Sequence, residues 1–125
     1  VYTVERIPAL AERARATLAD LGYEKVHVIC GDGSLGWPDA APYDGIVVTA
    51  VGPRVPDSLK HQLAEGGRLV IPVERKSGVQ ELIRLTRTGD NGFDTESLCD
   101  VRFVPLIGEE GWQKDDRRRW PLANL

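Results

Sequence analysis

The chain contains 125 residues, 42% of them hydrophobic, which is enough for one buried core and too little for two domains. Its 16 basic and 19 acidic side chains give a net charge of -3, so no broad electrostatic attraction to nucleic acid or anionic lipid is expected. No apolar run approaches the roughly 20 residues that a membrane-spanning helix needs, and no signal-peptide pattern is present. We therefore expect a cytoplasmic protein without a nucleic-acid or membrane partner.

The first third of the chain predicts a strand, a helix and a second strand. Residues 1–5 alternate β-branched and polar side chains, which is typical of a strand. Pro8 suits the first turn of a helix, and apolar residues at three- and four-residue spacing extend that helix to Leu21. A short strand over residues 25–30 then leads into a glycine-containing turn at residues 31–33.

The middle of the chain predicts a buried strand, a helix and a further strand. Residues 44–50 are mostly apolar without alternation, as in a strand buried on both faces, so we expect them near the centre of a parallel sheet. Pro56 opens a predicted helix that runs through Leu63 and ends at Gly66-Gly67. Residues 68–73 form the next predicted strand.

Two long alternating runs follow, over residues 79–87 and 93–104, and they flank the hairpin signal Gly89-Asp90-Asn91-Gly92. Strands alternating with helices and then an antiparallel hairpin indicate an α/β fold of the doubly wound, Rossmann-like type. Its sheet is expected to be mostly parallel, with the hairpin at the C-terminal side. We assign residues 1–112 to one domain and residues 113–125 to a charged, solvated tail.

Candidate site residues follow the carboxyl ends of the predicted strands, where open α/β sheets bind ligands. Glu5 either accepts hydrogen bonds from both hydroxyls of a ribose or caps the helix that follows, and its position alone does not separate the two. Asp32, flanked by glycines, can meet a base edge, although the tripeptide by itself favours a simple Asx-turn. Residues 49–53 are the third such place.

The cysteines and histidines predict no catalytic or metal site. Cys30 and Cys99 lie far apart without a CxxC spacing, so we expect buried free thiols. His27 on a strand and His61 on a helix are expected to be structural. No catalytic residue and no metal ligand is therefore assigned from the sequence.

An ordered series of short motifs runs through the chain. Its most specific parts are Gly31-Asp32-Gly33 with Gly36-Trp37-Pro38, and the run Val101-Arg102-Phe103-Val104-Pro105-Leu106. The other members, in chain order, are Val1-Tyr2-Thr3-Val4-Glu5-Arg6, Ala41-Pro42-Tyr43-Asp44, Val48-Thr49-Ala50, Val55-Pro56, Gln62-Leu63, Gly66-Gly67-Arg68-Leu69-Val70-Ile71-Pro72-Val73 and Gln80-Glu81-Leu82. In order and spacing, from Val1 to about Trp112, this set resembles the protein-L-isoaspartate O-methyltransferases.

The resemblance implies a partial S-adenosylmethionine-dependent methyltransferase domain that begins at the family's second strand. The family's first strand, its glycine-rich cofactor loop and its upstream substrate loops have no counterpart here, so we expect the complete gene to encode them upstream. Carried over by position, Glu5 binds the ribose, Asp32 and Gly33 border the adenine, and Thr49 and Ala50 line the methyl-transfer site.

The family transfers a methyl group from S-adenosylmethionine to the free α-carboxylate of an L-isoaspartyl residue, which begins the repair of damaged proteins. The resemblance thus implies S-adenosylmethionine as cofactor and isoaspartyl-containing proteins or peptides as partners. A carboxylate with a pKa near about 4 is already ionised at neutral pH, so the step needs alignment and exclusion of water, and no general base.

Two other classes stay open: another S-adenosylmethionine or dinucleotide enzyme, and a truncated, non-catalytic fragment that self-associates. Without the family's first strand, two apolar strand edges are left unpaired, so we expect the isolated chain to be inactive and to form a homo-oligomer. Two departures from the family pattern concern the lip of the pocket. Val51-Gly52 stands where small alanines are commoner, and Glu74 stands where glycine usually follows Pro-Val.

Overall fold

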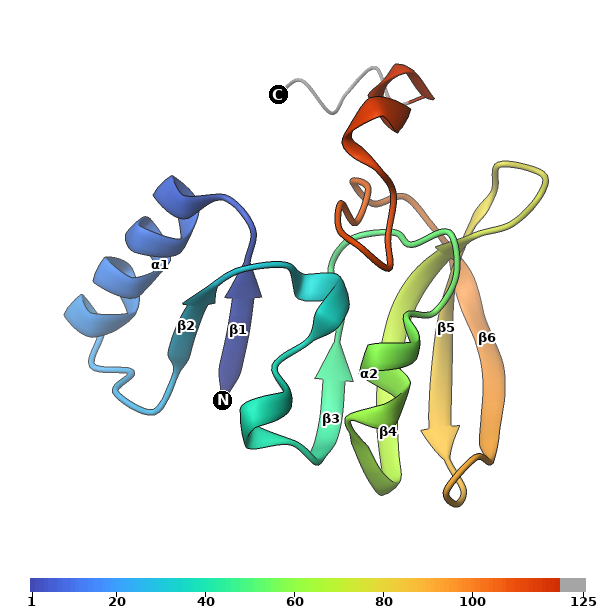
Figure 1. The fold of residues 1–125 in the computed structure, drawn as a ribbon, viewed down its shortest axis with the longest axis horizontal. Helices are drawn as coiled ribbons and strands as arrows, with labels where there is room; N and C mark the ends of the chain where they lie inside the picture. The colour runs from blue at the N-terminus through green and yellow to red at the C-terminus, as the bar shows by residue number, and fades with distance from the viewer. Residues whose placement is uncertain (120–125) are drawn as a thin grey trace.

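The computed structural model describes residues 1–119, and its first part is a parallel β-α-β unit (Figure 1). Strands β1 (Tyr2–Glu5) and β2 (His27–Cys30) pair in parallel, and helix α1 (Pro8–Asp20) connects them. Ala11 of α1 is fully buried between the helix and the two strands. The strand, helix and strand predicted for this part of the chain are confirmed, with each boundary shifted by at most two residues.

The second part is a four-stranded sheet in the order β3-β4-β5-β6. Strand β3 pairs in parallel with β4, whereas β4, β5 and β6 are antiparallel, so the predicted C-terminal hairpin is confirmed. The strands span β3 (Tyr43–Val47), β4 (Leu63–Glu74), β5 (Gln80–Arg87) and β6 (Phe93–Val101). Three 3-10 helices, η1 (Gly33–Leu35), η2 (Pro38–Ala40) and η3 (Lys114–Arg119), and helix α2 (Asp57–His61) complete the elements among the described residues.

The hydrophobic core lies between α2 and one face of this second sheet. Its buried members come from α2, β4 and β5, and the partly buried Ile83 and Phe93 pack against them. These buried residues are Leu59, Leu63, Leu69, Ile71 and Leu85. Burial of such branched side chains, at about 1.5–3 kcal/mol each, is the main stabilising term for this half of the chain.

The α/β class and the mixed sheet are confirmed, but the prediction that residues 44–50 form a central strand is wrong for this chain. Among the described residues, β3 is an edge strand, and the sheet is divided between β1 and β3. Val47 is 75% exposed. The apolar run predicts burial on both faces, but such burial requires elements packed over both faces of the sheet, and the core of this sheet lies on the face that α2 covers.

The helix predicted from Pro56 to Gly66-Gly67 is shorter than expected. Helix α2 ends at His61, and Leu63 already belongs to β4. Between the pairs Tyr43↔Leu63 and Gly45↔Arg68 the register shifts, and Gly66 there has φ +74°, so the glycines form an irregularity in the strand rather than a helix end.

Both cysteines are exposed, so the expectation of buried thiols is wrong. Cys30 ends β2 and Cys99 lies in β6, and each of these strands is at the outer edge of its sheet. The predicted charged tail, residues 113–125, lies within the described residues only as far as residue 119. No helix among the described residues is long and apolar enough to span a membrane.

Candidate functional site

The carboxyl ends of β1, β2 and β3 lie at one edge of the molecule (Figure 1). Glu5, the last residue of β1, pairs with Cys30, the last residue of β2. The Gly31 N–H donates to the Glu5 carbonyl over 3.0 Å, and a Cβ built on Gly33 would lie 3.8 Å from the Val4 carbonyl oxygen. The turn at residues 31–33 therefore crosses directly over the end of β1.

Glu5 is half-buried at this edge, and its carboxylate contacts the start of the helix that follows it. Its Oε1 accepts a hydrogen bond from the Ile7 N–H at 2.9 Å, and Ile7 is the N-cap residue of α1. This bond ties the Glu5 side chain to the start of α1, as the capping interpretation expects, but the N-cap residue of α1 makes no side-chain hydrogen bond of its own. One ionised carboxylate offers about four acceptor positions, so this bond leaves acceptor capacity for two hydroxyl groups. The ribose interpretation remains a prediction that is compatible with this contact.

The Asp32 carboxylate is held by three donors. Its Oδ1 accepts the Ser34 N–H at 2.9 Å and the Ser34 hydroxyl at 2.7 Å, which confirms the predicted local turn. Its Oδ2 accepts the backbone N–H of Glu109 at 2.8 Å, a residue 77 positions later in the chain. Asp32 thus joins the turn after β2 to a distant part of the chain.

That distant part is the C-terminal segment, by which we mean residues 106–112. The Glu110 N–H donates to the Ser34 hydroxyl at 3.1 Å, and the Glu110 carboxylate accepts the Ser58 N–H and hydroxyl at 2.9 and 2.6 Å. The Trp112 indole N–H donates to the Val51 carbonyl at 3.1 Å. These contacts hold the C-terminal segment against the turn after β2, the end of β3 and the first turn of α2, as its position above these elements in Figure 1 shows.

Sequence reasoning did not identify this segment as part of the candidate site. Glu109 and Glu110 contact Asp32 and Ser34 through backbone N–H groups, and a backbone donor leaves no residue-type signal in a sequence. The available signal was the pair Gly108 and Gly111 around two acidic residues, which marks a close turn.

Thr49 and Ala50 follow β3 at the same edge of the molecule. The Val48 N–H still donates to the Val70 carbonyl at 2.9 Å, so pairing with β4 continues to this point. Thr49 is exposed and Ala50 is half-buried, whereas Val51 is fully buried and pairs with Pro105 in an isolated bridge. The Val51 side chain is therefore packed in the interior and does not line the entrance of the expected pocket.

The loop between β2 and β3 is fixed by a buried glutamine. Gln62, at the C-terminal end of α2, accepts the Trp37 N–H at 2.9 Å and donates to the Leu35 carbonyl at 2.8 Å. The Tyr43 hydroxyl donates to the Trp37 carbonyl. Burial raises the pKa of Tyr43, and the charges of Tyr2 and Asp39 add to this rise. The Tyr43 hydroxyl therefore stays protonated as a donor at neutral pH.

The histidines lie away from this edge. His27 pairs with Tyr2 at the amino ends of the first two strands, and the two rings stack at 5.0 Å. His61 is exposed at the end of α2. Within residues 1–119 no group of three or more histidine, cysteine, aspartate or glutamate side chains is placed to hold a metal ion.

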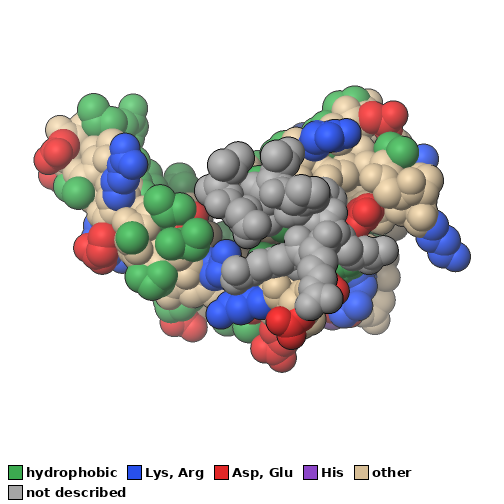
Figure 2. Space-filling model, turned by 90° about the horizontal axis from the view of Figure 1, so that it is seen from above, with side chains coloured by type: hydrophobic (Ala, Val, Ile, Leu, Met, Phe, Trp, Pro, Cys, Tyr) green, Lys and Arg blue, Asp and Glu red, His purple; other side chains and the backbone are tan. Residues whose placement is uncertain are grey.

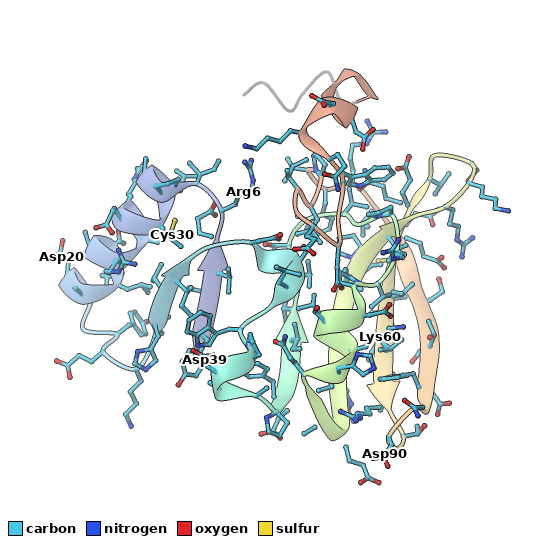
Figure 3. The ribbon with its side chains drawn as sticks, in the orientation of Figure 1. Arg6, Asp20, Cys30, Asp39, Lys60 and Asp90 are labelled. Atoms are coloured by element: carbon cyan, nitrogen blue, oxygen red, sulfur yellow. The ribbon has the colours of Figure 1, made fainter. Side chains whose placement is uncertain are left out.

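Figure 3 labels two other residues at the carboxyl edge. Cys30 is the last residue of β2, and Arg6 directly follows β1.

A parallel β-α-β unit with a carboxylate at a strand end and a tight glycine turn beside it defines the class of Rossmann-like α/β domains, which bind nucleosides at this edge. Residues 1–111 match the family model described as protein-L-isoaspartate(D-aspartate) O-methyltransferase. The chain belongs to this family, as the ordered motifs indicated.

Curated relatives carry the same name. A protein-L-isoaspartate O-methyltransferase of Rhodopseudomonas palustris is 60% identical over 116 residues, which cover 93% of this chain and 53% of the relative. Protein-L-isoaspartate O-methyltransferase 2 of Marinobacter nauticus is 57% identical over 112 residues, which cover 90% of this chain and 51% of the relative. The chain thus spans about half the length of the curated relatives it matches.

Solved structures agree with this assignment. A protein-L-isoaspartate O-methyltransferase superposes with a TM-score of 0.84 and 32% identity, over 95% of this chain and 38% of the other. A Plasmodium falciparum chain that carries the name of the same family superposes with a TM-score of 0.74 and 25% identity, over 86% and 52% of the two chains. That protein was solved in complex with S-adenosyl-L-homocysteine.

Proposed function

We propose that this chain is part of a cytoplasmic, S-adenosylmethionine-dependent protein-L-isoaspartate O-methyltransferase. It supplies the part of the enzyme that binds the nucleoside portion of the cofactor. The reaction is methyl transfer to the α-carboxylate of an L-isoaspartyl residue, and the partners are isoaspartyl-containing proteins or peptides. The observation that carries the proposal is that Glu5 ends β1 directly beside the turn at residues 31–33, whose Gly31 N–H donates to the Glu5 carbonyl, on a chain that belongs to this family. The net charge of -3 supports a protein without a nucleic-acid or membrane partner.

The donor and acceptor groups at the edge fit the adenosine part of the cofactor. Glu5 keeps acceptor capacity for the two ribose hydroxyls after it has accepted the Ile7 N–H. Gly33 has no side chain, so a flat adenine ring can approach the backbone beside Asp32. Glu5 is therefore proposed to bind the ribose, and Asp32 and Gly33 are proposed to border the adenine.

Small side chains are proposed to line the methyl-transfer site. When bound, S-adenosylmethionine supplies an electrophilic methyl group on a sulfonium. The acceptor, an α-carboxylate, has an ordinary pKa of about 3.3–3.7 and is ionised at neutral pH, so the protein needs no residue that removes a proton. Thr49 and Ala50 have the task of placing the carboxylate oxygen in line with the methyl carbon and of excluding water.

The isolated chain is proposed to self-associate and to be inactive by itself. The facing edges of β1 and β3 have no strand partner among the described residues, and unpaired edges favour pairing with another chain. These two strands also carry large exposed apolar side chains, Tyr2 of β1 at 44% and Val47 of β3 at 75%. Figure 2, which looks onto the carboxyl edge, shows hydrophobic side chains gathered over the α1 part of the molecule. A homo-oligomer covers this surface.

The activity is tested by methyl transfer from labelled S-adenosylmethionine to an isoaspartyl peptide, with the aspartyl peptide of the same sequence as control. Two proteins are compared: the 125-residue chain, and a fusion that places the N-terminal half of the Rhodopseudomonas palustris relative before Val1. We expect the fusion to methylate only the isoaspartyl peptide. A fusion that binds S-adenosylmethionine but methylates a different acceptor would favour another class of methyltransferase.

Light scattering at micromolar concentration and a titration with S-adenosylmethionine test the isolated chain. We expect a dimer or larger assembly with weak or undetectable binding. A well-folded monomer that binds S-adenosylmethionine tightly and methylates the isoaspartyl peptide would refute the proposal that this chain is an incomplete enzyme.

A further inference from the structure

We propose that Asn91 is a modification site, at which the chain deamidates spontaneously and becomes an isoaspartyl protein itself. Asn91 is one of two asparagines in the chain and the one that a glycine follows. Asparagine is a thermolabile residue, and a following glycine leaves its side-chain carbon open to attack because glycine has no Cβ. The formation of isoaspartate stands by itself, whereas its role as a methyl acceptor rests on the proposed function.

The reaction needs only the chain and water. The Gly92 backbone nitrogen loses its proton and bonds to the Asn91 Cγ, the bond from Cγ to the side-chain nitrogen breaks, and ammonia leaves with that proton. Water then opens the succinimide ring. Breaking the bond between the Gly92 nitrogen and the Asn91 backbone carbonyl carbon gives an isoaspartyl residue with a free α-carboxylate, whereas breaking the bond to Cγ gives aspartate. The first product carries the group that the proposed reaction methylates.

The turn between β5 and β6 leaves this reaction unobstructed. Asn91 is exposed, so water reaches its side chain. The Thr88 N–H closes the turn by donating to the Gly92 carbonyl at 2.8 Å, but within residues 1–119 the Gly92 N–H itself donates to no acceptor. Ring closure therefore breaks no hydrogen bond of the attacking nitrogen.

The other half of the turn is held by an arginine. The Arg87 guanidinium donates to the Gly89 carbonyl at 3.0 Å and to the Asp90 carbonyl at 3.3 Å. These bonds fix the peptide groups that precede Asn91. Rotation about the Asn91 Cα–C bond, which brings the next nitrogen towards Cγ, leaves both of them in place.

Two aspartates that are followed by glycine, Asp32 and Asp44, are internal comparators, because aspartate can close the same ring with loss of water. The Asp32 carboxylate accepts the Ser34 N–H at 2.9 Å and the Ser34 hydroxyl at 2.7 Å. Asp44 and Gly45 lie inside β3, which pairs with β4. Folding restrains both pairs, so we expect isoaspartate at Asn91 well before it forms at either aspartate.

The turn lies far from the candidate site of its own chain. Figure 3 labels Asp90, in this turn, at the opposite end of the sheet from Arg6 and Cys30, which lie at the carboxyl edge. Strand β5, with 8 residues, spans about 26 Å between the two ends. A modified Asn91 is therefore methylated by another enzyme molecule and not by the site of its own chain.

Ageing the folded 125-residue chain in mildly alkaline buffer, followed by a brief tryptic digest and electron-transfer fragmentation, tests the modification. We expect the peptide of residues 88–102 to lose its amide at Asn91 and to contain isoaspartate there. Asn91→Gln is the matched control, because it keeps an amide but closes a larger ring, and it should stay unmodified at this position. In urea the rate at Asn91 should change by less than about threefold, whereas Asp32 and Asp44 should form isoaspartate faster than in the folded chain.

Two outcomes overturn the modification. An Asn91 that keeps its amide in the folded chain but loses it in urea shows that the turn protects it. Equal amounts of isoaspartate at Asp32, Asp44 and Asn91 in the folded chain show that the fold does not select the site.

The aged chain is then offered as methyl acceptor to the Rhodopseudomonas palustris relative with labelled S-adenosylmethionine. We expect label in proportion to the isoaspartate at Asn91, and label near background in the Asn91→Gln chain aged alike. A standard isoaspartyl peptide shows that the relative is active in the same buffer. Isoaspartate at Asn91 without label overturns the acceptor role. The relative is the catalyst here, so this measurement can fail while the fusion described above is active, and the reverse.

Discussion

Replacing Gln62 by alanine tests whether one buried side chain fixes the loop that carries the candidate site. Gln62 is only 8% exposed, and its amide accepts the Trp37 N–H at 2.9 Å and donates to the Leu35 carbonyl at 2.8 Å. A Cβ built on Gly36 would lie 2.2 Å from Gln62 Oε1, so the loop packs closely against the amide. Gln62→Ala removes both bonds and leaves two backbone groups without partners.

The expected loss follows from these two bonds. A hydrogen bond within a protein contributes about 0.5–1.5 kcal/mol net, and a buried group left without a partner costs about 1–3 kcal/mol. Leu35 and Trp37 are half-buried, so water reaches them after truncation and reduces the penalty. We therefore expect Gln62→Ala to lower the free energy of unfolding by about 2–3 kcal/mol.

Urea unfolding, followed by far-ultraviolet circular dichroism at one fixed protein concentration, measures this loss, because self-association shifts apparent stability. Gln113→Ala is the control, since Gln113 is exposed and its side-chain amide lies a long 3.5 Å from the Gly108 carbonyl oxygen. The control should stay within about 0.5 kcal/mol of the unaltered chain. A Gln62→Ala variant as stable as the control would refute the argument that this amide holds the loop.

Two further predictions concern single carboxylates. In a protein that binds S-adenosylmethionine, Glu5→Gln should weaken binding by about 1–3 kcal/mol, because it disturbs charge-assisted hydrogen bonds to the ribose; unchanged affinity by calorimetry removes Glu5 from the site. Hydrogen bonds from Ser97 and Arg75 lower the pKa of Glu81, so its stabilisation is present above the unfolded-state pKa of about 4.3 and is lost as pH falls through the lower folded-state pKa. Glu81→Gln should therefore lower the free energy of unfolding at pH ~7 and lower it progressively less as the pH falls, as urea midpoints measure. An equal effect at neutral and at acid pH contradicts the lowered pKa of Glu81.

Local patterns identified most elements because each depends on nearby residues. Pro8 and the apolar spacing predicted α1, and Gly89 to Gly92 predicted the turn between β5 and β6. The end of α2 was not predictable in this way. The chain leaves the helix at His61 because Leu63 pairs with Tyr43 and enters the core, and a partner 20 positions earlier leaves no local signal.

The candidate site was only partly predictable for the same reason. Glu5 and Asp32 follow strand ends, so their place at the carboxyl edge follows from the α/β pattern. Ser34 and Glu110 contact each other although they lie 76 positions apart in the sequence, and no spacing rule predicts such a contact. The exposure of Cys30 and Cys99 likewise depends on which strands lie at sheet edges.

The sequence by itself determined the order of strands and helices, the antiparallel hairpin and the family, because periodicity, turn residues and ordered motifs are all properties of the linear chain. Tertiary structure alone decided that the sheet is divided between β1 and β3, because strand pairing depends on which neighbours are present, and that Val47 is exposed, because burial depends on which elements pack over each face of the sheet. It also decided that Asp32 holds the C-terminal segment, because a carboxylate takes whichever donors folding brings within hydrogen-bonding distance.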